Sequence, residues 1–184
     1  MSNVDHPLMH LAGRQPGVIC VTSDAGLLGG LNMSVMSQAI KEAQKNKARL
    51  IIEPACAEMA ARYATKQEIA SLKELLTTVE PLFMESNATI LVGPDIDFHS
   101  KIASMSGNSY LQKMLNAVIV PENDIRKVIL RLPNHQGVTH QDHVEVFKAI
   151  EKRDPDAARE AMTAALERPL TAINNYMKNK GKSR

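Results

Sequence analysis

The sequence predicts a mainly α-helical fold, a helical bundle preceded by a short βα segment. Aromatic residues make up 3% of the 184-residue chain and Trp is absent, whereas Met occurs ten times. Cores of Ala, Leu, Ile and Met are typical of helices rather than β-sandwiches. From residue 48 onward, apolar residues recur at helical spacing. A hydrophobic content of 44% with 23% charged residues indicates a globular chain.

The βα segment is predicted before residue 48. Residues 18–22 form a short, β-branched run typical of a buried strand. Gly26, Gly29 and Gly30 then predict a turn, and a helix is expected over about 32–45. Such a turn can bind a phosphate. This one lacks the dinucleotide-binding spacing and a following Lys-Ser/Thr, which favours a structural turn.

Helix start and stop signals divide the rest of the chain. Thr65 and Glu68 form a capping box, and Asp154 is an N-cap followed by Pro155. Gly107 ends a short helix that contains Asp95 and His99, and Asn108 or Ser109 caps the next one. The expected helices cover residues 49–63, 65–79, 95–105, 110–118, 124–132, 141–150 and 155–177. We also expect an irregular stretch over 81–94, a loop over 133–139 and a break in the last helix near Pro169.

Asp95 and His99 are four residues apart, so both side chains lie on one face of their helix. A carboxylate and an imidazole that converge can hold a divalent cation. They can equally form a hydrogen-bonded pair in the core, which is the commoner arrangement. His143 shares an apolar, inward face with Phe147 and Ile150, and therefore favours a site that all three residues share.

The bulk composition argues against several classes of protein. A net charge of +2 is too small to indicate nucleic-acid binding on its own. Cys20 and Cys56 lack zinc or redox spacing, which favours a cytoplasmic setting. No run approaches the ~20 apolar residues of a membrane span, and no signal pattern opens the chain, so we expect no membrane partner and no export.

Four features in a fixed order resemble one family. They are Arg49-Leu-Ile-Ile-Glu-Pro-Ala, Asp95-Ile-Asp-Phe-His99 with Ser106-Gly-Asn108, His143 before Ala149-Ile150, and Arg153-Asp-Pro-Asp-Ala-Ala. Over roughly residues 48–178 they resemble the FCD domain, the effector-binding domain of FadR-type GntR transcription regulators. The resemblance implies an antiparallel helical bundle with a central cavity.

In many FCD domains an Asp and three His hold a divalent metal (zinc, nickel or manganese here), which helps to bind a small carboxylate effector. Asp95, His99 and His143 match three of these ligands. The fourth position is Ala165. An absent ligand leaves a coordination position for water or the effector, or else indicates that the metal has been lost. His140, one turn before His143, could serve as the fourth ligand instead, but fraying of the expected loop beside it makes this less favourable.

Arg49 matches a family arginine that can face the cavity, where a guanidinium would bind a carboxylate bidentately. The alternative is an exposed arginine at a helix start. His6, His10 and His135 are expected in loops or the tail and have no assigned role. The resemblance also implies a homodimer. We expect DNA contact only through a winged-helix domain that this chain does not contain.

The beginning of the chain resembles a different family. Val21-Thr-Ser-Asp-Ala-Gly-Leu-Leu-Gly-Gly-Leu-Asn32, after His6-Pro7-Leu8, is similar to the middle domain of the ATP synthase gamma subunit, with Ala25 where an Arg is usual. The similarity covers residues 6–46, and the long helices of the rotor shaft have no counterpart. We therefore expect a βα segment over 1–47 and an FCD-like, ligand-binding bundle over 48–184.

These expectations rank three candidate functions for the chain. The first is a small-molecule sensor domain of a transcription regulator, without enzyme activity. The second is a structural fragment of the ATP synthase gamma subunit. The third is a metal-dependent enzyme. It ranks last because no general base or nucleophile is evident beyond the expected ligands.

Overall fold

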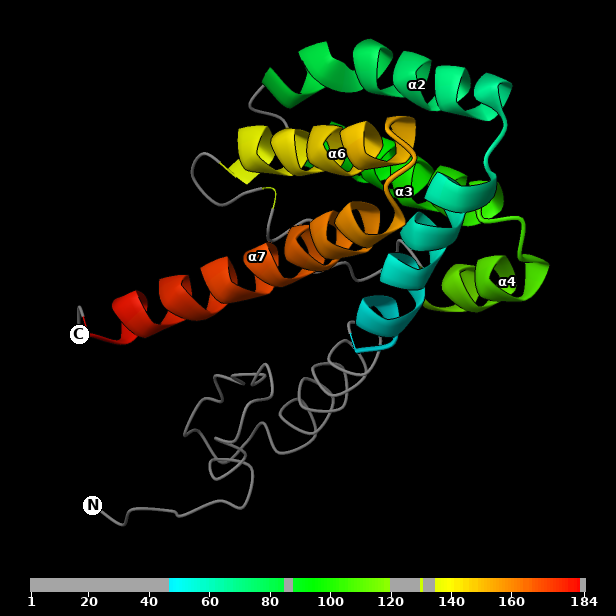
Figure 1. Ribbon diagram of the computed structural model, residues 1–184. Helices are drawn as coiled ribbons and strands as arrows, with labels where there is room; N and C mark the ends of the chain where they lie inside the picture. The colour runs from blue at the N-terminus through cyan, green and yellow to red at the C-terminus, as the bar shows by residue number, and fades with distance from the viewer. Residues whose placement is uncertain (1–46, 85–87, 120–129, 131–134, 183–184) are drawn as a thin grey trace.

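The computed structural model describes residues 47–84, 88–119, 130 and 135–182 (Figure 1). All regular structure within these ranges is helical, which confirms the mainly α-helical prediction. The expected βα segment lies outside the described residues. A helix over residues 47–63 (hereafter helix 47–63) is followed by α2 (Lys66–Met84), α3 (Ala88–Met105), α4 (Ser109–Val118), α6 (His135–Glu151) and α7 (Pro155–Lys182).

Side-chain caps fix three of the helix starts where the sequence places them. The backbone N–H and the hydroxyl of Thr65 both donate to Glu68 Oε2 at 2.8 Å, and the Glu68 N–H donates to Thr65 Oγ1 at 3.1 Å. Asn108 Oδ1 accepts from the backbone N–H groups of Tyr110 and Leu111 in the first turn of α4. Asp154 Oδ1 accepts from the N–H of Ala157 at 3.0 Å. These contacts satisfy donors that a helix start leaves unpaired.

Three helices continue through prolines at which irregularity or a break was expected, the first being α2, which contains Pro81. Pro94 lies inside α3, so Asp95 is in the middle of an 18-residue helix. Pro169 lies inside α7, which is continuous over 28 residues. A proline removes one helical hydrogen bond. Around Pro94, burial of Leu91 and Val92 against residues of α2 offsets that loss.

The start of α6 also differs from the prediction. Residues 135–139 were expected in a loop, but α6 begins at His135, and His135 and His140 are both buried. Thr139 supports this first turn by donating its hydroxyl to the His135 carbonyl at 3.0 Å. Of the helix expected over residues 124–132, the described part is Leu130, which lies in a turn.

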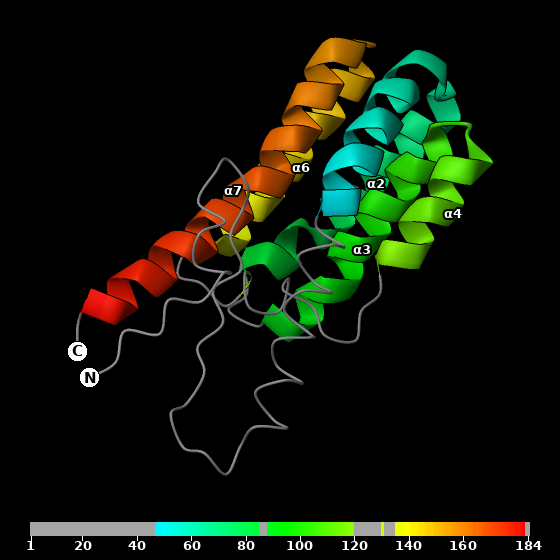
Figure 2. The ribbon, with the colours of Figure 1, turned by 90° about the horizontal axis from the view of Figure 1, so that it is seen from below.

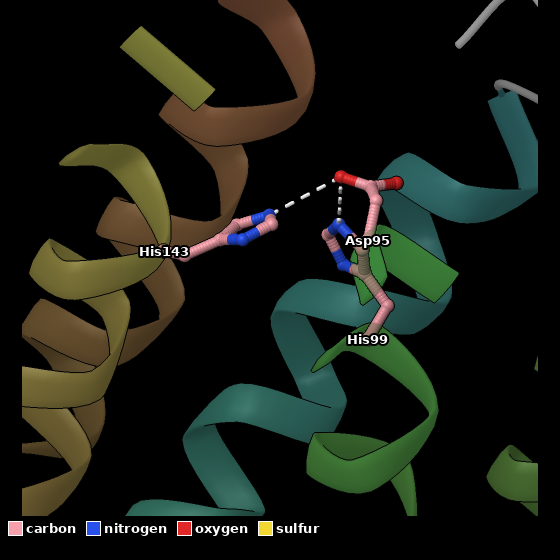
Figure 3. A group of neighbouring side chains, drawn as sticks. All are labelled: Asp95, His99 and His143. Atoms are coloured by element: carbon pink, nitrogen blue, oxygen red, sulfur yellow. Dashed lines mark ion pairs between the residues drawn. The ribbon is translucent and has the colours of Figure 1, made fainter. Parts of the chain in front are cut away.

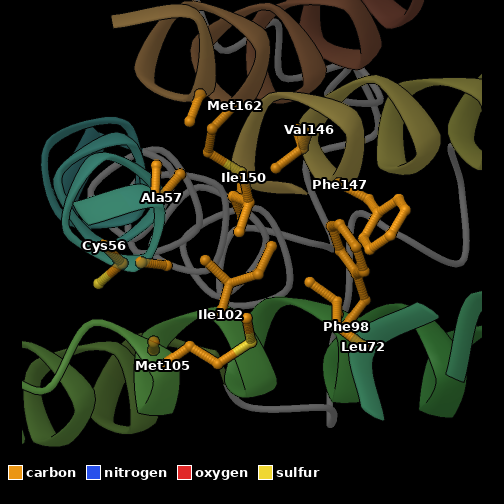
Figure 4. Packing of buried hydrophobic residues seen from close by; sticks show 14 of the residues in the cluster. Cys56, Ala57, Leu72, Phe98, Ile102, Met105, Val146, Phe147, Ile150 and Met162 are labelled. Atoms are coloured by element: carbon orange, nitrogen blue, oxygen red, sulfur yellow. The ribbon is translucent and has the colours of Figure 1, made fainter. Parts of the chain in front are cut away.

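The larger of two apolar clusters in the described part of the chain joins the helices into a bundle (Figure 4). Along the bundle, α6 packs against α7 and α2, while α3 packs against α2 and α4 (Figure 2). Helix 47–63 contributes small side chains that permit close approach, Cys56, Ala57, Ala60 and Ala61. Phe98, Ile102, Val146, Ile150 and Met162 fill the centre. Among the described helices, none is long and apolar enough to cross a membrane.

Candidate metal centre

Asp95, His99 and His143 meet inside the bundle (Figure 3). Asp95 Oδ1 lies 3.8 Å from His99 Nε2 and 3.3 Å from His143 Nε2. One ligand atom from each residue lies within 4.8 Å of those of the other two. All three residues are buried, and at most 6% of any of them is exposed. The structure therefore brings together the three residues that the sequence singled out.

The two imidazoles are held by different neighbours. The ring of His143 stacks on Phe98, with centroids 3.9 Å apart and planes 17° from parallel. Phe83 meets His143 edge-on at 6.0 Å. Burial lowers the pKa of His143, against an opposing contribution from Asp95. This ring therefore favours the neutral form, which is the form that ligates a metal.

His99 has a carboxylate behind it that the sequence analysis did not assign to the site. Glu53 of helix 47–63 is 1% exposed, and its Oε2 lies 2.5 Å from His99 Nδ1. Its other oxygen forms an ion pair with Arg49 Nε. Arg49 is itself buried, so the alternative of an exposed arginine at a helix start is wrong. Arg49, Glu53 and His99 form a continuous polar row leading to Asp95 and His143.

Charge within this row outweighs burial. Burial alone would raise the pKa of Glu53, but Arg49 and His99 lower it to about 2. Burial would lower the pKa of His99, yet Glu53 and Asp95 raise it. Glu53 is therefore ionised at neutral pH, and its neighbours stabilise that charge.

Neither position considered for a fourth ligand adds a donor to this group. Ala165 in α7 is partly buried against the apolar core and offers no ligand atom. His140 is buried within α6, so the expected fraying is wrong. Its Nε2 lies 3.9 Å from Glu80, and it does not belong to the group formed by Asp95, His99 and His143.

The donor atoms fit a divalent transition metal. Two imidazole nitrogens and one carboxylate oxygen suit zinc, nickel or manganese. The carboxylate of Glu53 beside His99 Nδ1 is the arrangement by which proteins commonly orient a metal-binding histidine. The local signal for Glu53 was its spacing of four residues from Arg49, but the same spacing is common in exposed helical ion pairs.

Comparisons with known proteins agree with the helical architecture. A family model described as the FCD domain matches residues 46–168. The transcriptional repressor NanR of Edwardsiella tarda is 29% identical over 143 residues, covering 77% of this chain and 54% of that protein. NanR of Klebsiella aerogenes is 28% identical over 161 residues, covering 85% and 59%. The chain thus spans just over half the length of these relatives.

A solved structure, Streptococcus agalactiae GntR, has a similar fold, with a TM-score of 0.57 and 24% identity over 71% of this chain and 58% of that one. Residues 47–184 are 75% of the 184 residues, so the 85% coverage by the Klebsiella relative includes part of residues 1–46. The similarity of residues 6–46 to the ATP synthase gamma subunit stays a prediction.

Proposed function

Because the chain belongs to the FCD domain family, we propose that it is the effector-sensing domain of a GntR-type transcription regulator. Its effector would be a small carboxylate, bound with the help of a divalent metal. The relatives named above are transcriptional repressors, which supports a regulatory role rather than catalysis. The observation that carries the proposal is the convergence of Asp95, His99 and His143 inside the bundle.

Asp95 Oδ1 and the Nε2 atoms of His99 and His143 would hold the metal. When bound, the cation supplies a positive charge that attracts the carboxylate of an effector. Three protein ligands leave at least one position for water or that carboxylate. Ala165 fills no such position, because its side chain is a methyl group.

Arg49 would contribute a second positive group for the effector. Its ion pair with Glu53 uses Nε, and a guanidinium carries four further N–H donors that suit a carboxylate. Binding of an effector would change the packing of the helices that supply these groups. In a full regulator, that change would pass to DNA-binding domains. The resemblance to the family also leads us to propose a homodimer, which light scattering would test.

Metal analysis of untagged protein, combined with thermal unfolding in zinc, nickel and manganese, tests the metal site. We expect a bound metal and a raised unfolding temperature, both lost in His143→Ala. His135→Ala is the matched control, because His135 is also a buried histidine of α6 but lies outside the group. Ala165→His should strengthen binding if a fourth ligand completes the site. Absence of metal and of stabilisation in both wild type and Ala165→His would exclude the metal.

A panel of small carboxylates, screened by thermal unfolding with and without metal, tests the sensor role. We expect stabilisation by at least one of them, lost in Arg49→Ala and kept in Arg62→Ala. Arg62 is the matched control because it also pairs with a glutamate of helix 47–63, at the surface. Equal stabilisation in both variants would remove Arg49 from the effector site.

A further inference from the structure

Glu53 is placed to control which nitrogen of His99 faces the candidate metal centre. We propose that Glu53 is a positioning residue, which holds the Nδ1–H of His99 so that the Nε2 lone pair points toward Asp95 and His143. The metal-related part of this inference rests on the proposed function. The part that concerns the His99 ring does not.

The two nitrogens of the His99 ring face different side chains. Nδ1 lies 2.5 Å from Glu53 Oε2, on helix 47–63, and Nε2 lies 3.8 Å from Asp95 Oδ1, one turn earlier in α3. A neutral imidazole carries one proton, and its other nitrogen is an acceptor. An ionised carboxylate accepts hydrogen bonds and donates none. Carboxylates face both nitrogens, but Glu53 lies closer to Nδ1 than Asp95 lies to Nε2, so the single proton of a neutral ring is favoured on Nδ1, which leaves the Nε2 lone pair free to ligate.

Arg49 holds the Glu53 carboxylate in position beside His99 Nδ1. Glu53 pairs with Arg49 through Oε1, and its Oε2 approaches His99 Nδ1 to 2.5 Å, so a nitrogen-bearing group faces each oxygen. The side chain is 1% exposed, which leaves little room for another rotamer. The ring of His143 is oriented differently, because it stacks on Phe98. His99 meets Phe98 edge-on at 5.4 Å, a contact that does not distinguish its two nitrogens.

The test combines two measurements on wild type, Glu53→Gln and Glu53→Ala. Long-range nitrogen–proton NMR of histidine-labelled, metal-free protein reports the His99 tautomer, at a pH where the nitrogen shifts show a neutral ring. Competition with a chromophoric chelator gives the zinc affinity. Glu58→Gln is the matched control, since Glu58 lies on the same helix and pairs with Arg62 and Arg159 instead.

We expect the Nδ1–H tautomer in wild type and Glu58→Gln, and its loss in Glu53→Ala. Zinc affinity should fall about 10- to 100-fold in Glu53→Ala, as is typical when the partner of a metal-bound histidine is removed. It should fall less in Glu53→Gln, whose amide oxygen can still accept from Nδ1. Glu53→Gln is nearly isosteric and carries the test if Glu53→Ala does not fold.

A wild-type ring with its proton on Nε2 would overturn the inference. So would a folded Glu53→Ala protein that keeps the wild-type tautomer, or a Glu53→Gln protein with unchanged zinc affinity. If wild type binds no zinc yet shows an Nδ1–H that depends on Glu53, the metal part of the proposed function fails while the positioning of His99 stands. The two failures are therefore distinguishable.

Discussion

Two glutamates on one helix make similar ion pairs in opposite environments. Glu53 faces the bundle interior, with Arg49 and His99 as partners, and its side chain is 1% exposed. Five residues later, Glu58 pairs with Arg62 at 3.1 Å and with Arg159 of α7 at 2.5 Å. The side chains of these two arginines are 47% and 51% exposed.

The difference between them lies in the surrounding medium rather than in the pairing. Water competes for both partners of Glu58, so an exposed pair of this kind adds little to stability. Around Glu53 no solvent replaces a lost partner, so removal of one member leaves a buried charge uncompensated. A network that is costly to bury and costly to break is more readily explained by a role in the site than by stability.

The largest expected effect is that of Glu53→Ala. Loss of the carboxylate leaves Arg49 buried without its partner, and we expect a decrease of about 3 kcal/mol in the free energy of unfolding. Urea denaturation followed by circular dichroism measures it. The double variant Arg49→Met/Glu53→Leu should recover most of the loss, because it removes the buried charges together. A single-variant loss below about 1 kcal/mol would contradict this view of the row.

An intermediate effect is expected at the ion pair between Asp142 of α6 and Arg168 of α7. Asp142 is 4% exposed, whereas the Arg168 side chain is 44% exposed. Burial raises the pKa of Asp142 to about 6 despite Arg168. A carboxyl group that protonates so readily limits the cost of losing its partner, so Arg168→Ala should destabilise by about 1 kcal/mol. Arg168→Lys, which keeps the charge, should lie between the variant and wild type by the same urea measurement.

Glu58→Ala should produce a change in the urea midpoint that is hard to separate from wild type. Salt distinguishes the two glutamates further. In 1 M salt the screening length is about 3 Å, so any contribution of Glu58 should disappear while that of Glu53 persists. A Glu58 effect that equals the Glu53 effect, or resists salt, would remove the contrast between the two environments.

An effect smaller than that of Arg168→Ala is expected at the capping carboxylate of Glu68. Hydrogen bonds from the Thr65 backbone and hydroxyl lower the pKa of Glu68 below its ordinary 4.5. The ionised cap therefore stabilises α2 above that pH, and its contribution is lost as the pH falls through the lowered pKa. Glu68→Gln should be less stable than wild type by about 0.5 kcal/mol at pH 7. Thermal unfolding over a pH series should show the two curves converging in acid.

Sequence reasoning succeeded where local chemistry decides the structure. The caps at Thr65, Asn108 and Asp154 act over three residues, so the residue types suffice to predict them. The same holds for Asp95 and His99, whose shared face follows from helical spacing. The positive φ of 69° at Gly107 likewise confirms the expected helix stop.

Features that depend on packing between distant segments could not be predicted from the sequence. Pro94 and Pro169 are breakers by local rules, yet the helices around them continue. Glu53 could not be assigned to the site, because its spacing from Arg49 is also that of an exposed pair. Its burial depends on α3 lying alongside helix 47–63 and presenting His99, which no short window of sequence contains.

The placement of the three donors on two helices has a consequence for folding. Asp95 and His99 need a single turn of α3 to come together, whereas His143 follows 44 residues after His99. Bringing His143 to the other two residues closes a loop of that length, which costs conformational entropy, and the packing of α6 into the bundle must offset this cost. The complete donor set therefore exists in the assembled bundle and not in its isolated segments. A ligand that requires all three groups would therefore bind the native state and stabilise it, without stabilising partly folded states.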